Sequence, residues 1–376
     1  MDNPLQKIIS AGKGIFSGPS SESAVGIDIG SSSIKVVQIK KKAGKAVLET
    51  YGAVSLGPYA ETEIGLITNL ETGKIVEAIT EVLKESGVST KSSALSISSQ
   101  SSLVFTITLP PKVRDSNLAT IVPTEARKYI PVPITEVSLD WFILPQKETS
   151  FEEANNPDLP PPSAATMEVL VVAIQNEAIS KYESVVKQCG LEAGFFELEI
   201  FSSIRANFEH ELSPVMLLDF GASKTKLTIV EFGSVKSFHT ISRGSAEVTD
   251  SIAQSLDIPF IKAEELKKEF GMLENSTEKS LPEIIKVHTD YIFSEANSAL
   301  LNYEKKYNKA ISKVILTGGG SLLKGFKENA ASNFPMQVEI GSPFSKVGAP
   351  VFLDKVLSAA GPEFAIALGL ALRKLQ

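Results

Sequence analysis

A short pattern of residues occurs twice in this chain of 376 residues. The segments IDIGSSSIKV and LDFGASKTKL pair Asp28 with Asp219, Gly30 with Gly221, Ser32 with Ser223 and Lys35 with Lys226. The offset is the same at every position, and each copy continues as a predicted meander of three strands. Two copies of one unit predict a pseudo-twofold molecule with a cleft between its halves.

In each copy, Asp and Gly stand where a buried strand ends in a tight turn. Glycine lets the backbone approach a phosphate, whose oxygens accept hydrogen bonds from free N–H groups of the turn. Aspartate can hold Mg²⁺ through water. A single strand–Asp–x–Gly would also fit an ordinary turn, but two facing copies favour a clamp around a triphosphate and its metal. The predicted phosphate-binding residues are Asp28, Gly30, Ser31, Ser32, Ser33, Lys35, Asp219, Gly221, Ala222, Ser223 and Lys224, with Asp28 and Asp219 also predicted to hold the metal.

A third glycine-rich segment, TGGGS at 317–321, ends a predicted strand and begins a predicted helix. Its glycines would let the chain pass beside a base or ribose. On another predicted helix, Glu264 and Lys267 share one face, so they either contact ribose and adenine or form a solvated ion pair. The predicted adenosine-binding residues are Glu264, Lys267, Gly318, Gly319, Gly320 and Ser321.

The composition narrows the class of protein. A formal net charge of −7 and a pI of about 5.3 argue against a general nucleic-acid binder. The single cysteine, Cys189, excludes a disulfide within the chain. Because no run of about 18 apolar residues is evident, we expect no membrane span and a cytoplasmic location.

The order of predicted elements sets a small insert apart from the two copies. Residues 1–24 predict a flexible tail. Residues 99–175 predict an α+β insert with a polar, proline-rich loop at 147–162. Helices are predicted at about 73–86, 115–129, 177–189, 201–210, 245–256, 262–271 and 282–306, and a last one in PEFAIALGLALRKL.

These motifs resemble those of a known superfamily. IDIGSSSIK is similar to the first phosphate motif of actin, Hsp70 and FtsA, LLDFGASKTKLTI to the second, and ILTGGGSLLKGF to the adenosine motif. Within the FtsA-like branch, GIDIGSSSIKVVQIK, EARKYIPVPITEVSLDW and SLLKGF resemble the PilM family of type IV pilus assembly proteins. The resemblance covers nearly all of residues 25–376. It implies an α/β, actin-like (RNase H-like) ATPase fold, with two duplicated halves around a nucleotide cleft and with ATP and Mg²⁺ as cofactors.

The resemblance also implies subdomains and partners. Subdomain 1A would comprise 25–98, 176–210 and 361–376, the insert 99–175 would be subdomain 1C, and 211–360 would form the second half, with 2B at about 245–310. Such proteins are cytoplasmic and peripheral at the inner membrane, where they bind the short cytoplasmic N-terminal segment of PilN. The implied function is therefore an ATP-binding adaptor whose partners are a PilN-like bitopic protein and other pilus inner-membrane components. Self-association is a further expectation, whereas binding of nucleic acid is not expected.

Two more residues follow from the resemblance. Glu199, in FELEIFSS, aligns with an acidic residue that positions water or metal in relatives, and it is the candidate catalytic residue; the alternative is a structural glutamate on a strand. Arg127 is of a residue type found at binding hot spots. We predict that the partner peptide docks near Arg127, at the 1A–1C junction and outside the ATP cleft, whereas Tyr129 packs the helix of the insert against its sheet.

Some positions depart from the family pattern. The second turn is GASK where FtsA-like proteins have GGGT, so Lys224 replaces a threonine and Lys226 replaces an acidic or amide residue. We therefore expect ATP binding with weak or no ATPase activity. One alternative is an FtsA-like, filament-forming cell-division ATPase, although such chains usually carry a C-terminal amphipathic helix. The other is an actin-fold sugar kinase, which would need a catalytic Asp and sugar-binding residues between the motifs.

Overall fold

The computed structural model describes residues 23–110, 115–144, 166–209, 211–273 and 278–376. The loop predicted at 147–162 and most of the tail predicted at 1–24 lie outside these residues. Ser23 and Ala24, which the predicted tail included, belong to the first strand.

The first half is built around a five-stranded sheet in the order β3-β2-β1-β4-β8. Its strands are β1 (Ser23–Ile29), β2 (Ser33–Lys42), β3 (Lys45–Ser55), β4 (Ser92–Ile97) and β8 (Glu192–Leu198). The first three form an antiparallel meander, whereas β4 lies parallel to β1 and β8 lies parallel to β4. Consecutive residues of the inner strands β1 and β4 are buried, so both faces of the sheet are covered.

The second half repeats this arrangement in the order β11-β10-β9-β12-β13. Its strands are β9 (Val215–Phe220), β10 (Thr225–Glu231), β11 (Ser234–Ile241), β12 (Lys313–Thr317) and β13 (Gln337–Ile340). The meander is again antiparallel, and β12 and β13 are again parallel additions. In the register, Asp28 lies opposite Lys35 in one hairpin and Asp219 opposite Lys226 in the other. The duplication read from the sequence is therefore a duplication of the fold.

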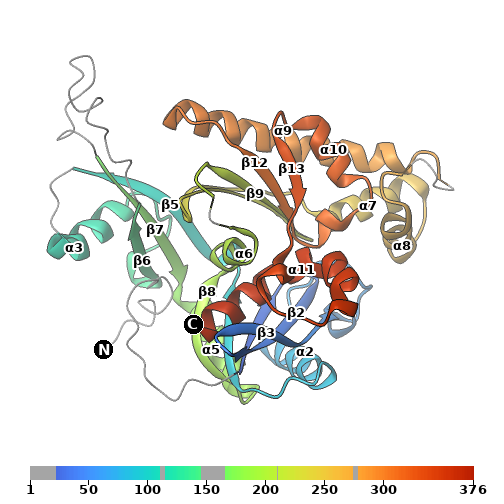
Figure 1. Ribbon diagram of the computed structural model, residues 1–376, viewed down its shortest axis with the longest axis horizontal. Helices are drawn as coiled ribbons and strands as arrows, with labels where there is room; N and C mark the ends of the chain where they lie inside the picture. Colours follow the sequence, from blue (N-terminus) through green and yellow to red (C-terminus); the bar gives the residue numbers. More distant parts are fainter. Residues whose placement is uncertain (1–22, 111–114, 145–165, 210, 274–277) are drawn as a thin grey trace.

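Helices cover both sheets. They are α2 (Thr72–Glu85), α5 (Asn176–Gln188), α6 (Glu199–Asn207), α7 (Ser245–Leu256), α8 (Phe260–Phe270), α9 (Leu281–Tyr307), α10 (Phe326–Asn333) and α11 (Asp354–Leu375). In the first half, α2 and α5 pack on one face of the sheet and α11 on the other. In the second half, α7 to α10 cover one face. Figure 1 shows the second half above the first, with α11 between the two sheets.

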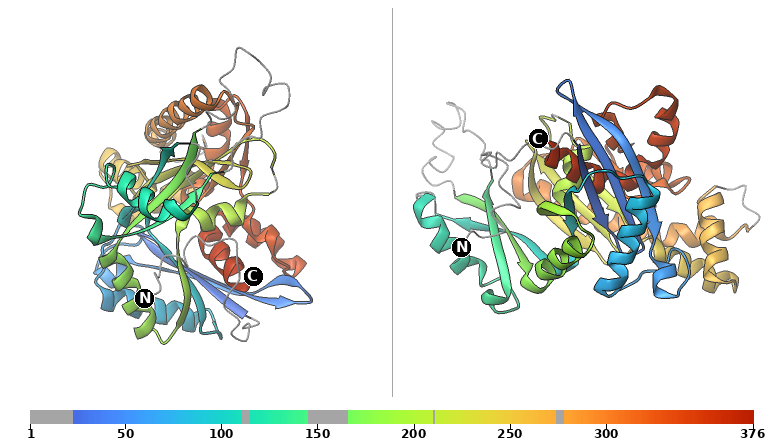
Figure 2. Two further views of the ribbon diagram at one scale, coloured as in Figure 1. Left: turned by 90° about the vertical axis from the view of Figure 1, so that its left-hand side faces the viewer. Right: turned by 90° about the horizontal axis from the view of Figure 1, so that it is seen from below.

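The insert forms a separate three-stranded antiparallel sheet in the order β5-β7-β6. Its elements are β5 (Ser102–Leu109), α3 (Asp115–Ala126), β6 (Val137–Ile143) and β7 (Met167–Gln175). One face of this sheet packs against α3, and the other packs against the second sheet and α6. Figures 1 and 2 show the insert at one side of the molecule, so that it contacts both halves.

Residues 351–375, which contain α11, form a helical stretch that by length and a mean hydropathy of 1.4 could cross a membrane. The sequence analysis expects no such segment. In the structure, 56% of the apolar 18-residue window in this stretch is buried inside the fold. A Cβ atom on Gly369 would lie 1.9 Å from the carbonyl oxygen of Ser202, so α11 and α6 cross in close contact. We therefore describe α11 as a core helix.

Several predicted boundaries were wrong. The last helix begins at Asp354 rather than near Pro362, and α3 ends at Ala126 rather than Tyr129. Glu199, for which a strand was the alternative position, is the first residue of α6. Residues Gly319–Leu322 form a 3₁₀ turn instead of starting a longer helix. The next helix, α10, starts only at Phe326, because Gly325 has a positive φ of 82° and is therefore not helical.

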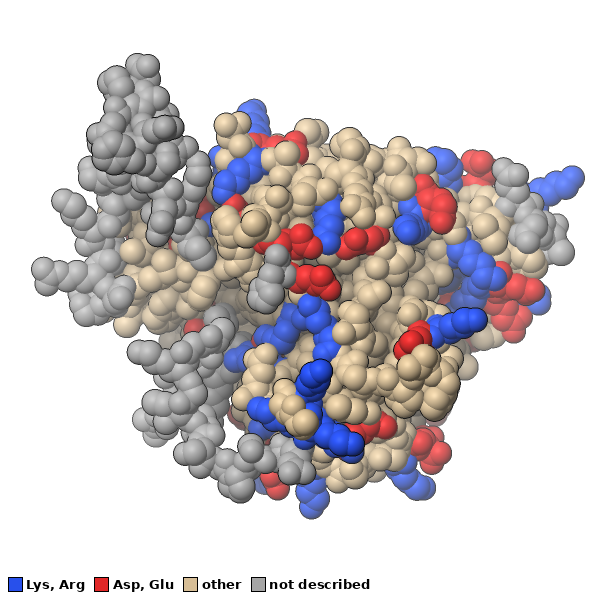
Figure 3. Space-filling view, viewed as in Figure 1, with Lys and Arg blue, Asp and Glu red and all other residues tan. Residues whose placement is uncertain are grey.

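Charged side chains of both signs are spread over the surface. Figure 3 shows Lys and Arg interspersed with Asp and Glu on the face that it presents, rather than a single field of one sign. This agrees with the modest net charge of −7. Charges of both signs on this face cancel at long range, so this face should not attract a polyanion from a distance.

Candidate functional site

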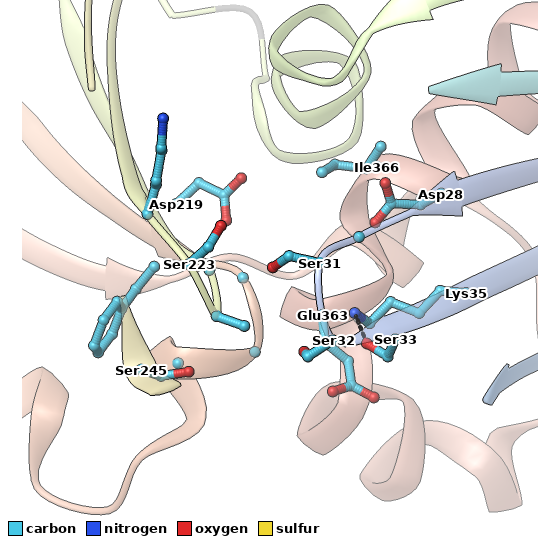
Figure 4. A pocket seen from close by; sticks show the side chains of 18 of the residues that line it. Asp28, Ser31, Ser32, Ser33, Lys35, Asp219, Ser223, Ser245, Glu363 and Ile366 are labelled. Carbon is cyan, nitrogen blue, oxygen red and sulfur yellow. Dashed lines mark hydrogen bonds between the residues drawn. The ribbon is translucent and has the colours of Figure 1, made fainter. Parts of the chain in front are cut away.

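A cavity of about 540 Å³ lies between the two halves. Every residue predicted to hold phosphate lines it, and so do Glu199, Glu264, Lys267 and the three glycines at 318–320. Figure 4 shows Ser31 to Ser33, Lys35 and Asp28 on one side, facing Asp219, Ser223 and Ser245 on the other. Segments far apart in the sequence therefore converge on one cleft.

The two turns that face each other have the same geometry. The N–H of Gly30 donates to the carbonyl oxygen of Ser33 at 3.1 Å, and the N–H of Gly221 donates to that of Lys224, also at 3.1 Å. Each glycine thus closes a hairpin whose strands bring an aspartate to the edge of the cleft. A Cβ on Gly221 would lie 3.0 Å from the Lys224 carbonyl oxygen, and a Cβ on Gly30 would lie 2.9 Å from that of Ser33, so the same close contact favours glycine at both positions.

Other segments hold each turn in place. The carbonyl oxygen of Ser31 accepts a hydrogen bond from the N–H of Thr68 at 2.8 Å. In the second turn, Gly221 and Ala222 accept bonds from the N–H groups of Ser245 and Ala246, at the start of α7, at 2.9 and 3.0 Å. The carbonyls of the turns therefore point into the protein. This leaves the serine side chains of the turns available to the cleft.

The third glycine segment packs directly against the second turn. Gly318 has φ of 81°, and a Cβ there would lie 2.2 Å from Oδ1 of Asp219. Only glycine combines this backbone conformation with such close contact. Ser321, by contrast, is buried, donates to the carbonyl oxygen of Gly318 at 2.7 Å and is not among the residues that line the cavity. We therefore drop Ser321 from the predicted adenosine set and regard it as a residue that shapes the loop.

Glu264 and Lys267 form a buried ion pair at the wall of the cleft, which corrects the alternative of a solvated pair. Their side chains are 10% and 8% exposed, and the charged atoms are 2.7 Å apart. Thr249 donates to Glu264 and accepts from Lys267, both at 2.6 Å. Burial raises the pKa of Glu264, but Lys267 and Thr249 outweigh it, so that the pKa lies below its ordinary value.

Glu199 is held by a partner from the other half of the chain. Its carboxylate lies 2.7 Å from the ammonium of Lys226, and its Oε1 accepts the N–H of Ser99 at 2.9 Å. Burial raises the pKa of Glu199, but Lys226 and the Ser99 N–H more than offset this, so the pKa is lowered. Glu199 is therefore a paired carboxylate at the base of the cleft rather than a free one.

Asp28 and Asp219 differ in their surroundings. Oδ1 of Asp28 accepts a hydrogen bond from Ser96 at 2.8 Å, and burial raises the pKa of this carboxyl in spite of the charge of Lys35. Asp219 lies 3.5 Å from the ammonium of Lys226. The two halves thus present equivalent aspartates with different neighbours.

The two aspartates would give a hydrated magnesium ion different surroundings. Magnesium keeps several waters and binds through one or two carboxylates together with the phosphates of a nucleotide. Asp28 lines the cleft, but burial raises the pKa of its carboxyl and so disfavours the charged form that holds a cation. Between Asp219 and Glu199, the Lys226 ammonium already fills the position of a cation. Within the residues that the structure describes, no group of three or more His, Cys, Asp or Glu side chains is arranged to hold a metal directly.

Several residues that line the cavity were not predicted from the sequence. They include Gly65, Ser98, Ser99, Gln100, Ser245, Lys268, Pro362 and Glu363. Gln100 reaches across the cleft and donates to Ser223 at 3.4 Å, and a Cβ on Gly65 would lie 3.2 Å from the Glu264 side chain. None belongs to a glycine motif, so no local signal marks them; the one exception is Ser98–Gln100, which directly follows a buried strand.

Arg127 lies far from this cavity, on the insert. It follows α3 and is exposed, next to Lys128, which pairs with Glu125 at 2.6 Å. The ring of Tyr129 stacks on Phe105 of β5, with centroids 5.1 Å apart, and still leaves 55% of the residue exposed. Tyr129 therefore packs onto the sheet, as expected, while keeping an open side.

The fold is similar to those of known proteins. A solved structure of a "PilM-PilN type IV pilus biogenesis complex" matches with a TM-score of 0.78 at 23% identity, over 95% of this chain and 100% of that chain. MreB5 of Spiroplasma citri, solved bound to ADP, matches with a TM-score of 0.51 at 12% identity, over 93% of this chain and 95% of that one. These matches show an actin-like fold.

Sequence comparison identifies the family. The cell division protein FtsA of Pseudomonas aeruginosa is 25% identical over 365 residues, which cover 86% of this chain and 84% of FtsA. The profile of the family described as "Type IV pilus assembly protein PilM" matches residues 26–375. The chain therefore belongs to the PilM family of type IV pilus assembly proteins.

Proposed function

We propose that this chain binds ATP in the cleft between its halves and acts as a nucleotide-dependent adaptor in type IV pilus assembly. The observation that carries the nucleotide part is the pair of matched turns. Gly30 and Gly221 close them with the same hydrogen bond, and they face each other across a cavity of about 540 Å³. A cavity of this size suits a ligand of a few hundred daltons.

The charges in the cleft suit a polyphosphate that is bound from two sides. Lys35 and Lys224 line the cavity, and no ion pair is seen for either within the described part of the chain. The hydroxyl groups of Ser31 to Ser33 and Ser223 face the same space. Lysines and hydroxyl groups are typical partners of phosphate oxygens. The Gly318–Gly320 loop and the Glu264–Lys267 pair would then border the nucleoside.

A substitution that fills the cleft tests the site. The Cβ of a residue at Gly319 would lie 3.6 Å from the nearest atom, in Glu363, so a side chain can start there and extend into the cavity. Gly319→Trp should abolish binding of a fluorescent ATP analogue. Gly73→Trp, at an open position of α2 with no atom within 4 Å, is the control and should bind like wild type. Wild-type affinity in Gly319→Trp would overturn the proposed site.

For the adaptor part, we propose that the insert binds the cytoplasmic N-terminal segment of a PilN-like bitopic protein. Membership in the PilM family supports this, and so does the PilM–PilN complex with a similar fold. Through this partner, the chain would be peripheral at the inner membrane. Other pilus components of that membrane would be its neighbours.

The exposed features of the insert suit a peptide. In the described part of the insert sheet, β6 pairs with β7 alone, so no described strand occupies its other edge, where a peptide could add as a strand. Phe142 and Ile143 at its end are 38% and 37% exposed. Arg127 and Tyr129 add a cationic and an aromatic group, which are enriched at binding hot spots.

A further inference from the structure

Lys35 and Lys226 occupy equivalent positions in the two copies of the repeat but have different partners. Each lies opposite an aspartate in its hairpin, Lys35 opposite Asp28 and Lys226 opposite Asp219. The ammonium of Lys35 donates to the hydroxyl oxygen of Ser33 at 2.7 Å, within its own turn and at the cavity (Figure 4). The ammonium of Lys226 instead crosses to Glu199 in the other half.

The environment of Lys226 is that of an enclosed cation. Its side chain is only 13% exposed, and its ammonium is 2.7 Å from Glu199 and 3.5 Å from Asp219, both of which are 10% exposed. Two carboxylates, one from each half of the chain, therefore enclose the Lys226 ammonium.

We propose that Lys226 is a built-in counter-cation of the cleft, which takes the place of a divalent cation between Asp219 and Glu199 and makes nucleotide binding nearly independent of Mg²⁺. This inference rests on the proposed binding of a nucleotide in the cleft. In this proposal, Lys226 positions Asp219 and Glu199, whereas Lys35 and the two turns contact the phosphates directly.

The physical reason is the charge that a triphosphate would meet. Without a cation, Asp219 and Glu199 would repel its oxygens across a poorly solvated cavity, where Coulomb interactions are stronger than in water. In a site without such a lysine, bound Mg²⁺ would supply the missing charge, and binding would depend on its concentration. A lysine ammonium is attached to the chain, so it offsets one of the two negative charges whether or not the metal is present.

The equivalent lysines provide a matched pair of variants. The dissociation constant of a fluorescent ATP analogue is measured in excess Mg²⁺ and in EDTA for wild type, Lys226→Met and Lys35→Met. For wild type, the constant in EDTA should exceed that in Mg²⁺ by less than about tenfold. In Lys226→Met, this ratio should rise by at least about tenfold, because two uncompensated carboxylates then face the phosphates. Lys35→Met should weaken binding in both buffers alike and keep the wild-type ratio.

A second readout uses the metal alone. Mg²⁺ without nucleotide should raise the melting temperature of Lys226→Met and leave that of wild type unchanged, because only the variant has a vacant cation position. If Lys226→Met does not fold, the wild-type measurements decide. A wild-type ratio above about tenfold, or stabilisation of wild type by Mg²⁺ alone, would overturn the proposal.

The remaining outcomes separate this inference from the proposed function. Equal ratios in wild type and Lys226→Met, with tight binding in both, would contradict the role of Lys226 and leave the nucleotide site intact. An absence of wild-type binding in both buffers would contradict the nucleotide site itself, and the role of Lys226 with it.

Discussion

The ammonium of Lys226 lies 2.7 Å from the carboxylate of Glu199, although Lys226 belongs to the second sheet and Glu199 opens a helix of the first half. This ion pair joins the two halves at the base of the cleft. Because Asp219 also lies 3.5 Å from Lys226, one lysine offsets part of the negative charge of the two carboxylates there. Because Glu199 is the candidate catalytic residue, this ion pair affects how fast the cleft could hydrolyse a bound nucleotide.

We predict slow hydrolysis of ATP. A general base works best when its pKa lies near the working pH, whereas Lys226 and the Ser99 N–H hold the pKa of Glu199 below its ordinary value. Phosphate release from the purified chain should run well below the ~10 s⁻¹ median of enzymes. Release at or above that rate without any partner protein would show that the paired Glu199 does not limit the reaction.

The Glu264–Lys267 pair should contribute to stability in a pH-dependent way. At neutral pH, Glu264→Gln should lower the free energy of unfolding by about 3 kcal/mol, because it leaves the buried Lys267 without its charge partner. Glu265→Gln is the control, since Glu265 forms an exposed pair with Lys262 at 3.2 Å; its effect should stay below about 1 kcal/mol. Urea unfolding measures both.

The sign of the pH effect follows from the lowered pKa of Glu264. Its stabilisation is fully present above the ordinary value of 4.5 and is lost as pH falls through the lower pKa of the folded state. The gap between wild type and Glu264→Gln should therefore narrow in acid. A gap that stays constant or widens as the pH drops below 4.5 would rule out this origin.

Gly318 tests the packing of the third glycine segment. Gly318→Ala places a methyl group 2.2 Å from Oδ1 of Asp219 at a φ of 81°. Gly233→Ala has a similar φ of 73° but no atom within 4 Å of the new Cβ, so it isolates the cost of the backbone conformation. We expect a loss of about 1 kcal/mol for Gly233→Ala and about 3 kcal/mol for Gly318→Ala. Equal losses in thermal or urea unfolding would show that the contact with Asp219 is unimportant.

The partner site on the insert can be tested by charge reversal. Arg127→Glu should lose binding of a PilN-like N-terminal peptide in calorimetry while it keeps nucleotide binding. Lys84→Glu, at an exposed position of α2, is the control and should keep both. Full peptide affinity in Arg127→Glu, or crosslinking of the peptide only beyond residue 211, would require another site.

The repeat allowed much of this architecture to be predicted. Asp-x-Gly at the end of an apolar strand defines a local hairpin, and two copies define two halves, so the residues of the two turns that line the cleft could be predicted from local patterns alone. The order of predicted elements marked the insert, and the PilM resemblance added the family. The prediction of a strand, a turn and a helix around TGGGS was right for the strand and the turn. The helix begins later than predicted, at Phe326, because Gly325 has a positive φ.

Contacts between the halves could not be read in the same way. Nothing near Glu199 in the sequence points to Lys226, because they meet only when the second sheet closes on the first. Likewise, Glu264 and Lys267 are a common surface pattern along a helix, and only the packing of α7 against α8 buries them around Thr249. Ser321 turns inward because Gly318 offers it a carbonyl.

Hydrogen exchange of the wild-type chain with and without ATP tests the central claim, that one nucleotide is held by both turns. The account predicts that peptides covering 29–35 and 219–226 both gain protection on addition of ATP, while α3 of the insert is unchanged. Protection of one turn only, or of neither, would contradict a nucleotide bound between the two halves.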